Sequence, residues 1–204
     1  MAVISNEERS TATRIALLDA SITALVRFGY YGATSTRIAE ISGLTRGAQM
    51  HHFKTKAALM VTALLHLHAR QLEHWMHVLA DMGETVSPKE LVDVLWASFE
   101  DDLWLAAAEL WVAARTDDQL REAIIPAEHE ISRRVRDKVA PLLKAEHADN
   151  GPVRLSTRRR SAIIGLIFST MRGMAMHEAF DPNTRRAKDQ RSELVKAVSA
   201  LLAQ

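Results

Sequence analysis

The sequence contains no cysteine, and it has few glycines, prolines and tyrosines. The absence of cysteine from 204 residues excludes a disulfide framework and any metal site with thiolate ligands, and it fits a reducing compartment. Only 8 glycines and 5 prolines interrupt the chain, and 2 tyrosines give little of the composition typical of β-rich proteins. These numbers favour an all-α protein of one or two domains with a sizeable core.

Long hydrophobic runs and familiar catalytic motifs are also missing. The longest apolar stretch, Ala162–Phe168, is far too short to cross a bilayer. The N-terminus lacks a basic segment followed by an apolar core, so we expect no signal peptide and a cytoplasmic location. Because there is no nucleophile elbow, phosphate-binding loop or HExxH motif, we expect a protein that is not an enzyme and has no cofactor.

The charged residues are distributed unevenly along the chain. The formal net charge of the whole chain is +1, which argues against a general nucleic-acid coat protein. Residues 1–56, however, carry seven Lys and Arg against four Asp and Glu, so this segment is basic and the remainder is slightly acidic. A basic head on a slightly acidic body suits a protein that presents one end to DNA.

The most informative segment is residues 33–56. Ser35 can cap a short helix, and Gly43 can adopt the positive φ that ends it. Thr45 can then cap a second short helix, Arg46–His52. Two such helices joined by a glycine turn are the sequence form of a helix-turn-helix, whose second helix enters the DNA major groove.

This segment resembles the recognition-helix segment of the TetR family of bacterial transcriptional regulators. The family typically reads Gly, apolar, Ser/Thr, basic, Gly, small, Leu, Tyr, two His/Tyr positions, Phe and then Lys at the start of a long helix. The matching residues are Gly43, Leu44, Thr45, Arg46, Gly47, Ala48, His51, His52, Phe53 and Lys56. Gln49 and Met50 depart from the usual Leu-Tyr pair. The resemblance covers about residues 12–65, and beyond them only the helix layout and the length resemble the family.

The remaining helix signals predict an N-terminal three-helix head and a C-terminal helical body. A capping box of Ser5 and Glu8 begins a first helix that runs to about Phe28 and braces the two short helices. We therefore expect a DNA-binding domain at residues 1–55 and a ligand-binding and dimerisation domain of about six helices at residues 56–204. The expected body helices are 56–82, one from Pro88 onward, one through Trp104 to Arg115, 118–146 with a kink at Pro126, 156–180 and 187–202.

Side chains near the start of the second short helix are expected to read DNA. Arg46 can donate two hydrogen bonds to a guanine or bind a phosphate, and the sequence leaves both open. Gln49 can pair with adenine, whereas Met50 cannot donate the hydrogen bond that the family tyrosine would. The resemblance implies contacts to phosphates or base edges from His51 and His52, and a phosphate contact from Lys56. The full predicted DNA-binding set is Ser35, Thr36, Arg37, Thr45, Arg46, Gly47, Ala48, Gln49, Met50, His51, His52 and Lys56.

A stripe of small residues on the predicted 156–180 helix permits close approach of another helix. It either packs inside one subunit or pairs two subunits, and the resemblance favours pairing because the last two helices of the family form a four-helix dimer interface. The predicted interface residues are Ser161, Gly165, Phe168, Ser169, Gly173, Val195, Val198 and Leu202.

Apolar and aromatic side chains of the body form either plain core or the lining of a ligand pocket. The resemblance implies a pocket for a small, often apolar effector, with two histidines as polar groups on its wall. The predicted lining is Met60, Leu64, His68, Trp75, Trp96, Phe99, Trp111, His129, Met171 and Met174. His74 and His77 share a helix face, but a third ligand at a convincing spacing is missing, so we expect no metal site.

Together these features predict a TetR-like regulator, a repressor by the commoner mode of the family. It is expected to bind a palindromic operator in double-stranded DNA as a homodimer, without a membrane partner, and to be released by a small, largely apolar ligand. The alternative is a helical ligand-sensing module whose head binds a protein partner instead of DNA.

Overall fold

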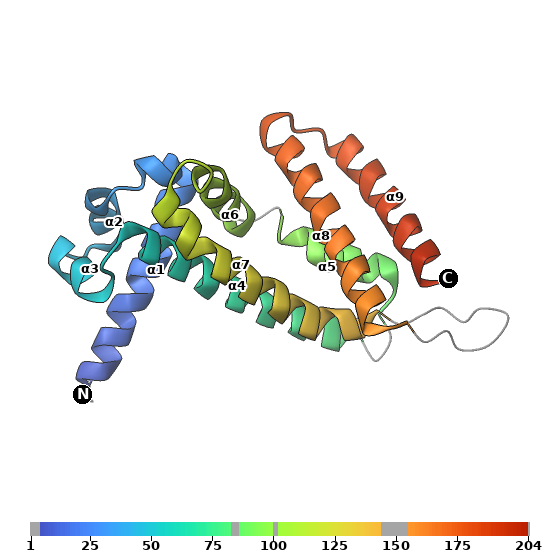
Figure 1. Ribbon diagram of the computed structural model, residues 1–204, viewed down its shortest axis with the longest axis horizontal. Coiled ribbons are helices and arrows are strands. Elements are labelled where there is room, and N and C mark those ends of the chain that lie inside the picture. Colours follow the sequence, from blue (N-terminus) through green and yellow to red (C-terminus); the bar gives the residue numbers. More distant parts are fainter. Residues whose placement is uncertain (1–4, 83–85, 100–101, 144–154, 204) are drawn as a thin grey trace. The chain divides into compact units, whose positions relative to one another are not determined.

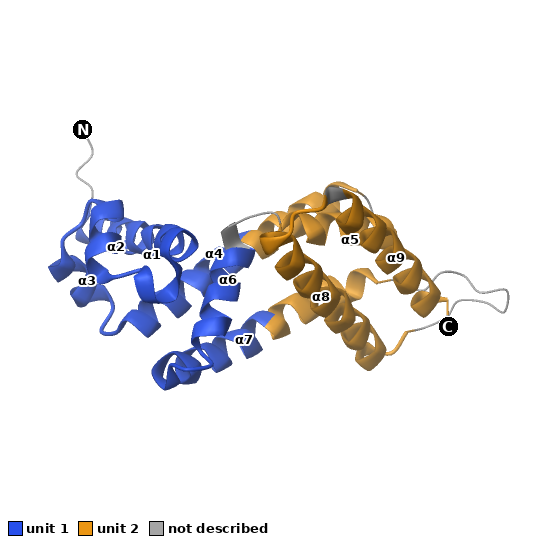
Figure 2. Ribbon diagram, turned by 90° about the horizontal axis from the view of Figure 1, so that it is seen from above, with its two compact units in different colours: residues 1–70, 101–131 blue, residues 71–100, 132–204 orange. Residues whose placement is uncertain are grey.

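A computed structural model describes residues 5–82, 86–99, 102–143 and 155–203 (Figure 1). Over these ranges the chain forms nine α-helices and one 3-10 helix, and no strand. It divides into two compact units, one of residues 1–70 and 101–131 and the other of residues 71–100 and 132–204 (Figure 2). The all-α prediction is confirmed. The units do not follow the predicted boundary after residue 55, so that functional division stays a prediction.

The first unit begins with the long helix α1, Asn6–Gly32. The predicted capping box is confirmed, because Ser5 Oγ accepts from the Glu8 backbone N–H at 3.1 Å and Glu8 Oε2 accepts from the Ser5 N–H at 2.7 Å. Gly29 interrupts the helical backbone with a φ of 65°. A Cβ at this position would lie 2.8 Å from Glu109 Oε2, the movable end of a side chain, so it is the positive φ that requires glycine.

Two short helices follow α1: α2 spans Ser35–Ser42 and α3 spans Arg46–His52. Gly43 ends α2 in the left-handed region at φ 69°, and Thr45 Oγ1 accepts from the Ala48 N–H at 3.2 Å, as predicted. The prediction that Ser35 caps α2 is wrong. The cap is Thr34, which has extended backbone and accepts from the Arg37 N–H, because the chain is still extended where it leaves α1 and becomes helical only at Ser35.

Helix α1 packs against α2, α3 and α6, which positions the two short helices. Its buried residues Leu17 and Leu25 share the core of this unit with Ile38 of α2 and with Phe53, which follows α3. The unit also contains the first part of α4 (Lys56–Asp81), together with α6 (Asp102–Ala113) and most of α7 (Asp118–Val139). Helix α4 begins at Lys56, as predicted.

The second unit contains α5 (Pro88–Ala97), α8 (Thr157–Phe180) and α9 (Thr184–Leu202). Pro88 lies in the first turn of α5, as predicted. The prediction of one helix from 118 to 146 is wrong, because α7 ends at Val139 and a 3-10 turn, Ala140–Leu142, follows it. Pro141 explains this end, since its backbone nitrogen has no hydrogen to continue the α-helix.

Two other predictions for this part of the chain differ in outcome. Helix α9 begins at Thr184 rather than at the predicted Ala187, because Asn183 Oδ1 accepts from the Arg186 N–H at 3.1 Å and caps the helix earlier. The strong loop signal at residues 149–152 lies outside the described residues.

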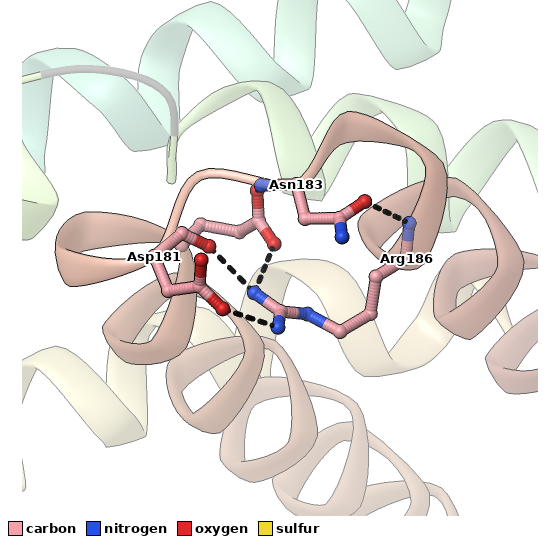
Figure 3. A network of polar contacts seen from close by, with 4 residues as sticks. Asp181, Asn183 and Arg186 are labelled. Carbon is pink, nitrogen blue, oxygen red and sulfur yellow. Dashed lines mark hydrogen bonds and ion pairs between the residues drawn. The ribbon is translucent and has the colours of Figure 1, made fainter.

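A polar cluster holds the turn between α8 and α9 (Figure 3). The Arg186 guanidinium donates to Asp181 Oδ2 at 2.9 Å, to the Asp181 carbonyl at 2.6 Å and to Glu178 Oε1 at 3.1 Å. Glu178 Oε2 accepts from the Asn183 N–H at 2.9 Å. The hydrogen bond and positive charge of Arg186 lower the pKa of Asp181 below 3.8. One arginine thus fixes α8 and α9 as an antiparallel hairpin.

None of the helices that the structure describes is both long and apolar enough to span a membrane.

Candidate nucleic-acid interface

The exposed surface of α2 and α3 contains most of the residues predicted to contact DNA. Thr36 and Arg37 are exposed in the first turn of α2, and the N-cap Thr45, Arg46 and Gly47 are exposed at the start of α3. Because α2 packs against α3, these residues belong to one small substructure of the first unit. Thr45 caps α3, and the amino end of this helix is exposed to solvent. Recognition helices contact base edges with residues at this end.

Two arginines of this surface lie in different surroundings. Arg46 is exposed, and over the described ranges its side chain makes no hydrogen bond or ion pair, so its five N–H groups are available. Arg37 donates to the Gly32 carbonyl at 2.8 Å, and its guanidinium lies 4.4 Å from the centroid of the Phe28 ring. Arg37 is therefore anchored to the end of α1, whereas Arg46 is free to bind a base or a phosphate.

The prediction that Gln49 contacts a base is wrong. Its side chain is buried, with 3% of its surface exposed, and its Nε2 donates to Ser35 Oγ at 3.2 Å. Gln49 occupies the position where the resemblance has leucine, and the helix period turns this position toward α2. The neighbouring Met50 points outward and is 59% exposed.

Beyond Met50, the predicted interface continues into residues with closer packing. His51 is exposed and His52 is half-buried. Their rings pack edge to face, with a distance of 5.2 Å between the ring centroids. The Lys56 ammonium donates to the Tyr30 carbonyl and lies 4.2 Å from the centroid of the Tyr30 ring. Burial lowers the pKa of Lys56, against the opposing effect of Asp117. The phosphate contact predicted for Lys56 would require its ammonium to leave Tyr30.

Comparison with curated proteins identifies relatives of the same regulatory class. No family model matches the chain. It is 28% identical to the HTH-type transcriptional regulator CymR of Pseudomonas putida, over 93% of this chain and 90% of that protein. It is 29% identical to the HTH-type transcriptional repressor AcnR of Corynebacterium efficiens, over 74% of each.

Solved structures share the fold along almost the whole length. A protein of Rhodococcus sp. assigned to the TetR family of transcriptional regulators matches with a TM-score of 0.71 and 20% identity, over 94% of this chain and 99% of that one. FadR of Bacillus subtilis, solved with stearoyl-CoA, matches with a TM-score of 0.62 and 18% identity, over 93% and 97%. The fold, the regulatory relatives and the motif at residues 43–56 agree. The chain has the fold of TetR-family regulators. Within this fold, α2 and α3 are the helix-turn-helix.

The residues predicted to line an effector pocket fall in both compact units of the chain. In the first unit, Met60 and Leu64 are buried, His68 is half-buried, and Trp111 Nε1 donates to Glu128 Oε1 at 2.8 Å. The prediction that His129 lines a pocket wall is wrong, because its side chain is exposed on α7. The alternation of faces along α7 could have indicated this, since Ile124, Ala127 and Ile131 form its buried side.

In the second unit, the predicted pocket residues form an aromatic cluster. The ring centroids of Trp75 and Phe168 lie 5.8 Å apart, and those of Phe168 and Phe99 lie 6.4 Å apart. The Phe99 ring stacks on Trp96 with a centroid distance of 5.9 Å. Met171 and Met174 are buried in the same unit. Trp75 is 1% exposed, and its buried indole N–H has no hydrogen-bond partner over the described ranges. Phe168, predicted for the dimer interface, instead belongs to this cluster.

A groove of about 720 Å³ runs along α8 and α9, and sequence reasoning did not foresee it. Leu166, Thr170 and Met174 line it from α8, and Leu194 and Ala197 are among its α9 residues. Its α9 side also carries polar side chains, including Asp189, Glu193 and Lys196. Across the described part of the chain, no group of three His, Asp or Glu side chains could hold a metal ion.

The small-residue stripe of α8 faces outward from its own subunit. Gly165, Ser169 and Gly173 are exposed, and a Cβ at either glycine would meet no atom within 4 Å. Close packing inside one subunit is therefore wrong as an explanation of the two glycines. Leu166, which lies beside Gly165, is 46% exposed and adds apolar surface to this face.

Two predicted interface residues on α9 are corrected. Val198 and Leu202 are 0% and 2% exposed, so they have no surface to offer a second subunit. They are buried because α9 packs against both α5 and α8. Val195 and Ser161 are half-buried.

Proposed function

We propose that this protein is a TetR-family transcriptional repressor that binds a palindromic DNA operator as a homodimer. The single observation that carries the proposal is the solvent-exposed start of α3, where the free guanidinium of Arg46 follows the cap Thr45. Arginine in this position donates two hydrogen bonds to guanine O6 and N7 in the major groove. Repression is the commoner mode of the family, and the relative AcnR is a repressor by name.

The size of α3 supports a dimer. Seven residues, Arg46–His52, bury too little surface for tight specific binding, so two copies of the head are needed. The outward face of α8, with Gly165, Leu166 and Gly173, offers a surface for helix pairing between subunits. A twofold dimer reads two half-sites of a palindrome on the same side of the duplex.

We further propose that a small, largely apolar effector releases the operator. The aromatic cluster of Trp75, Trp96, Phe99 and Phe168 supports an effector with apolar surface. The unpaired indole N–H of Trp75 suits a hydrogen-bond acceptor on that molecule. The dimer would have two conformations, one in which the spacing of its DNA-binding heads matches the operator and one in which it does not. An effector can release DNA only by binding more tightly to the second conformation than to the first. Equal affinity of an effector for free and DNA-bound protein would contradict this mechanism.

The test of the function is selection of the purified protein against random duplex DNA at low salt. A recovered palindrome with a defined half-site spacing supports a dimeric, sequence-specific regulator. Recovery of no sequence supports the alternative, a ligand-sensing module whose head binds a protein, and in that case Arg46→Ala leaves the biological activity intact.

A further inference from the structure

Gln49 is a buried polar side chain at the contact between α2 and α3. Its Nε2 donates to Ser35 Oγ at 3.2 Å, while its Oε1 is buried and has no hydrogen-bond partner among the described residues. Leucine at this position would fill a similar volume without a buried acceptor to satisfy. Packing alone therefore does not explain a glutamine here, and the amide must be explained by its partner.

The partner, Ser35, is not needed to cap its own helix. Thr34 Oγ1 accepts from the Arg37 N–H and serves as the cap of α2, which leaves the Ser35 hydroxyl without that role. A hydroxyl has one donor hydrogen and two acceptor positions. Because Ser35 Oγ accepts from Gln49, its own hydrogen remains to be donated, and it makes no hydrogen bond to a described residue.

We propose that Gln49 is a positioning residue for DNA binding, which holds Ser35 so that its hydroxyl donates to a DNA phosphate. The inference rests on the proposed function of α2 and α3. Ser35 lies half-buried in the first turn of α2, where free backbone N–H groups favour an anion, and Thr36 beside it is exposed. Gln49 itself never touches DNA, because it is buried, and it acts through Ser35.

The experiment compares operator binding of Gln49→Leu, Ser35→Ala and the double variant as a function of salt concentration. The operator is the sequence recovered by selection with the wild-type protein. Each single variant is expected to weaken binding by roughly tenfold per half-site, as for loss of a hydrogen bond to a charged group. Neither variant should change the slope of log K against log salt, because the serine hydroxyl is neutral and its contact with a phosphate releases no counterion.

The double variant should bind no more weakly than either single variant, because both remove the same contact. Ser35→Thr keeps the hydroxyl and should retain most of the wild-type affinity. The matched controls are Gln119→Leu, the same change at an exposed position of α7, and Ser10→Ala at an exposed position of α1, and both should bind like the wild type. If Gln49→Leu does not fold, Gln49→Met provides an unbranched side chain without the amide.

A merely structural role predicts a different pattern. In that case Gln49→Leu would lower thermal stability and leave the operator affinity of the folded protein at the wild-type level, or the affinity losses of the two single variants would add. Either result would overturn the inference while the proposed function stands. If the wild-type protein selects no DNA sequence, the proposed function and this inference fail together.

Discussion

At the scale of single residues, Arg46 and Lys56 show how two basic side chains of one motif differ in availability. Arg46 is exposed and unpaired, whereas the Lys56 ammonium lies against Tyr30. A free guanidinium can adapt to a base edge or a phosphate, while an engaged ammonium must first give up its carbonyl partner. We therefore expect Arg46 to contribute the larger share of operator binding.

Arg46→Ala should weaken operator binding by about 1–3 kcal/mol and relax the preference at one base position. Lys56→Ala should weaken binding less, and equally for all sequences. The measurement is titration of both variants against the selected operator and against duplexes that carry single base changes. Equal loss on every duplex for both variants would show that Arg46 binds phosphate and reads no base.

Tyr30 provides a test of the first unit at alkaline pH. Burial, followed by the charge of Asp117, raises the pKa of Tyr30 from 10.0 to about 12. A folded-state pKa above the unfolded value means that the stabilising effect of the neutral phenol is complete below pH 10 and is lost as the pH rises toward 12. Urea unfolding of the wild type should therefore show stability falling more steeply in this range than in Tyr30→Phe. The comparison variant is Tyr31→Phe, which removes the hydrogen bond between Tyr31 Oη and Thr116 Oγ1 and only the smallest contribution to the Tyr30 pKa, so it should keep the steep fall. Parallel curves for Tyr30→Phe and the wild type would contradict the assignment.

At the scale of elements, the caps separate what local sequence can predict from what it cannot. The capping box at Ser5 and the cap Thr45 act within three residues along the chain, so their sequence patterns were sufficient. At the start of α2, two adjacent hydroxyl residues, Thr34 and Ser35, can both serve as caps. The path of the chain leaving α1 decides between them, and that path depends on tertiary packing.

A single arginine holds the turn of the α8–α9 hairpin. Arg186→Ala removes three hydrogen bonds and leaves Glu178 and Asp181 without their partner, so the midpoint of thermal unfolding should fall by a few degrees. Since Arg186 holds the pKa of Asp181 below 3.8, the stabilisation is present above that pH and is lost as the pH falls through the lowered pKa. The difference between variant and wild type should thus shrink in acid.

The matched control for this prediction is Arg185→Ala, an exposed arginine one residue earlier, which should unfold like the wild type. Calorimetry at neutral and acid pH provides the measurement. A difference between Arg186→Ala and the wild type that persists unchanged in strong acid would mean that the Asp181 carboxylate is not involved.

At the scale of the whole molecule, the outward face of α8 bears on assembly. Leu166→Glu places a charge on the groove and beside Gly165, so it should convert the proposed dimer to monomer and weaken operator binding. Thermal stability of the monomer should change little, because the side chain is 46% exposed. Sedimentation equilibrium measures the assembly. Val112→Glu introduces the same charge on α6, at a side chain 57% exposed, and should leave the dimer intact. A dimeric Leu166→Glu protein would exclude this face of α8 as the interface.

By itself, the sequence determined the all-α class, the helix-turn-helix and most helix starts, because capping, glycine turns and helical periodicity act over a few neighbouring residues. Tertiary structure decided that Gln49 lies inside and His129 outside, and that Val198 and Leu202 pack within their own subunit. Periodicity shows which residues share a helix face, but not which neighbour covers that face. Other helices cover Gln49, Val198 and Leu202, and only folding brings those helices against them.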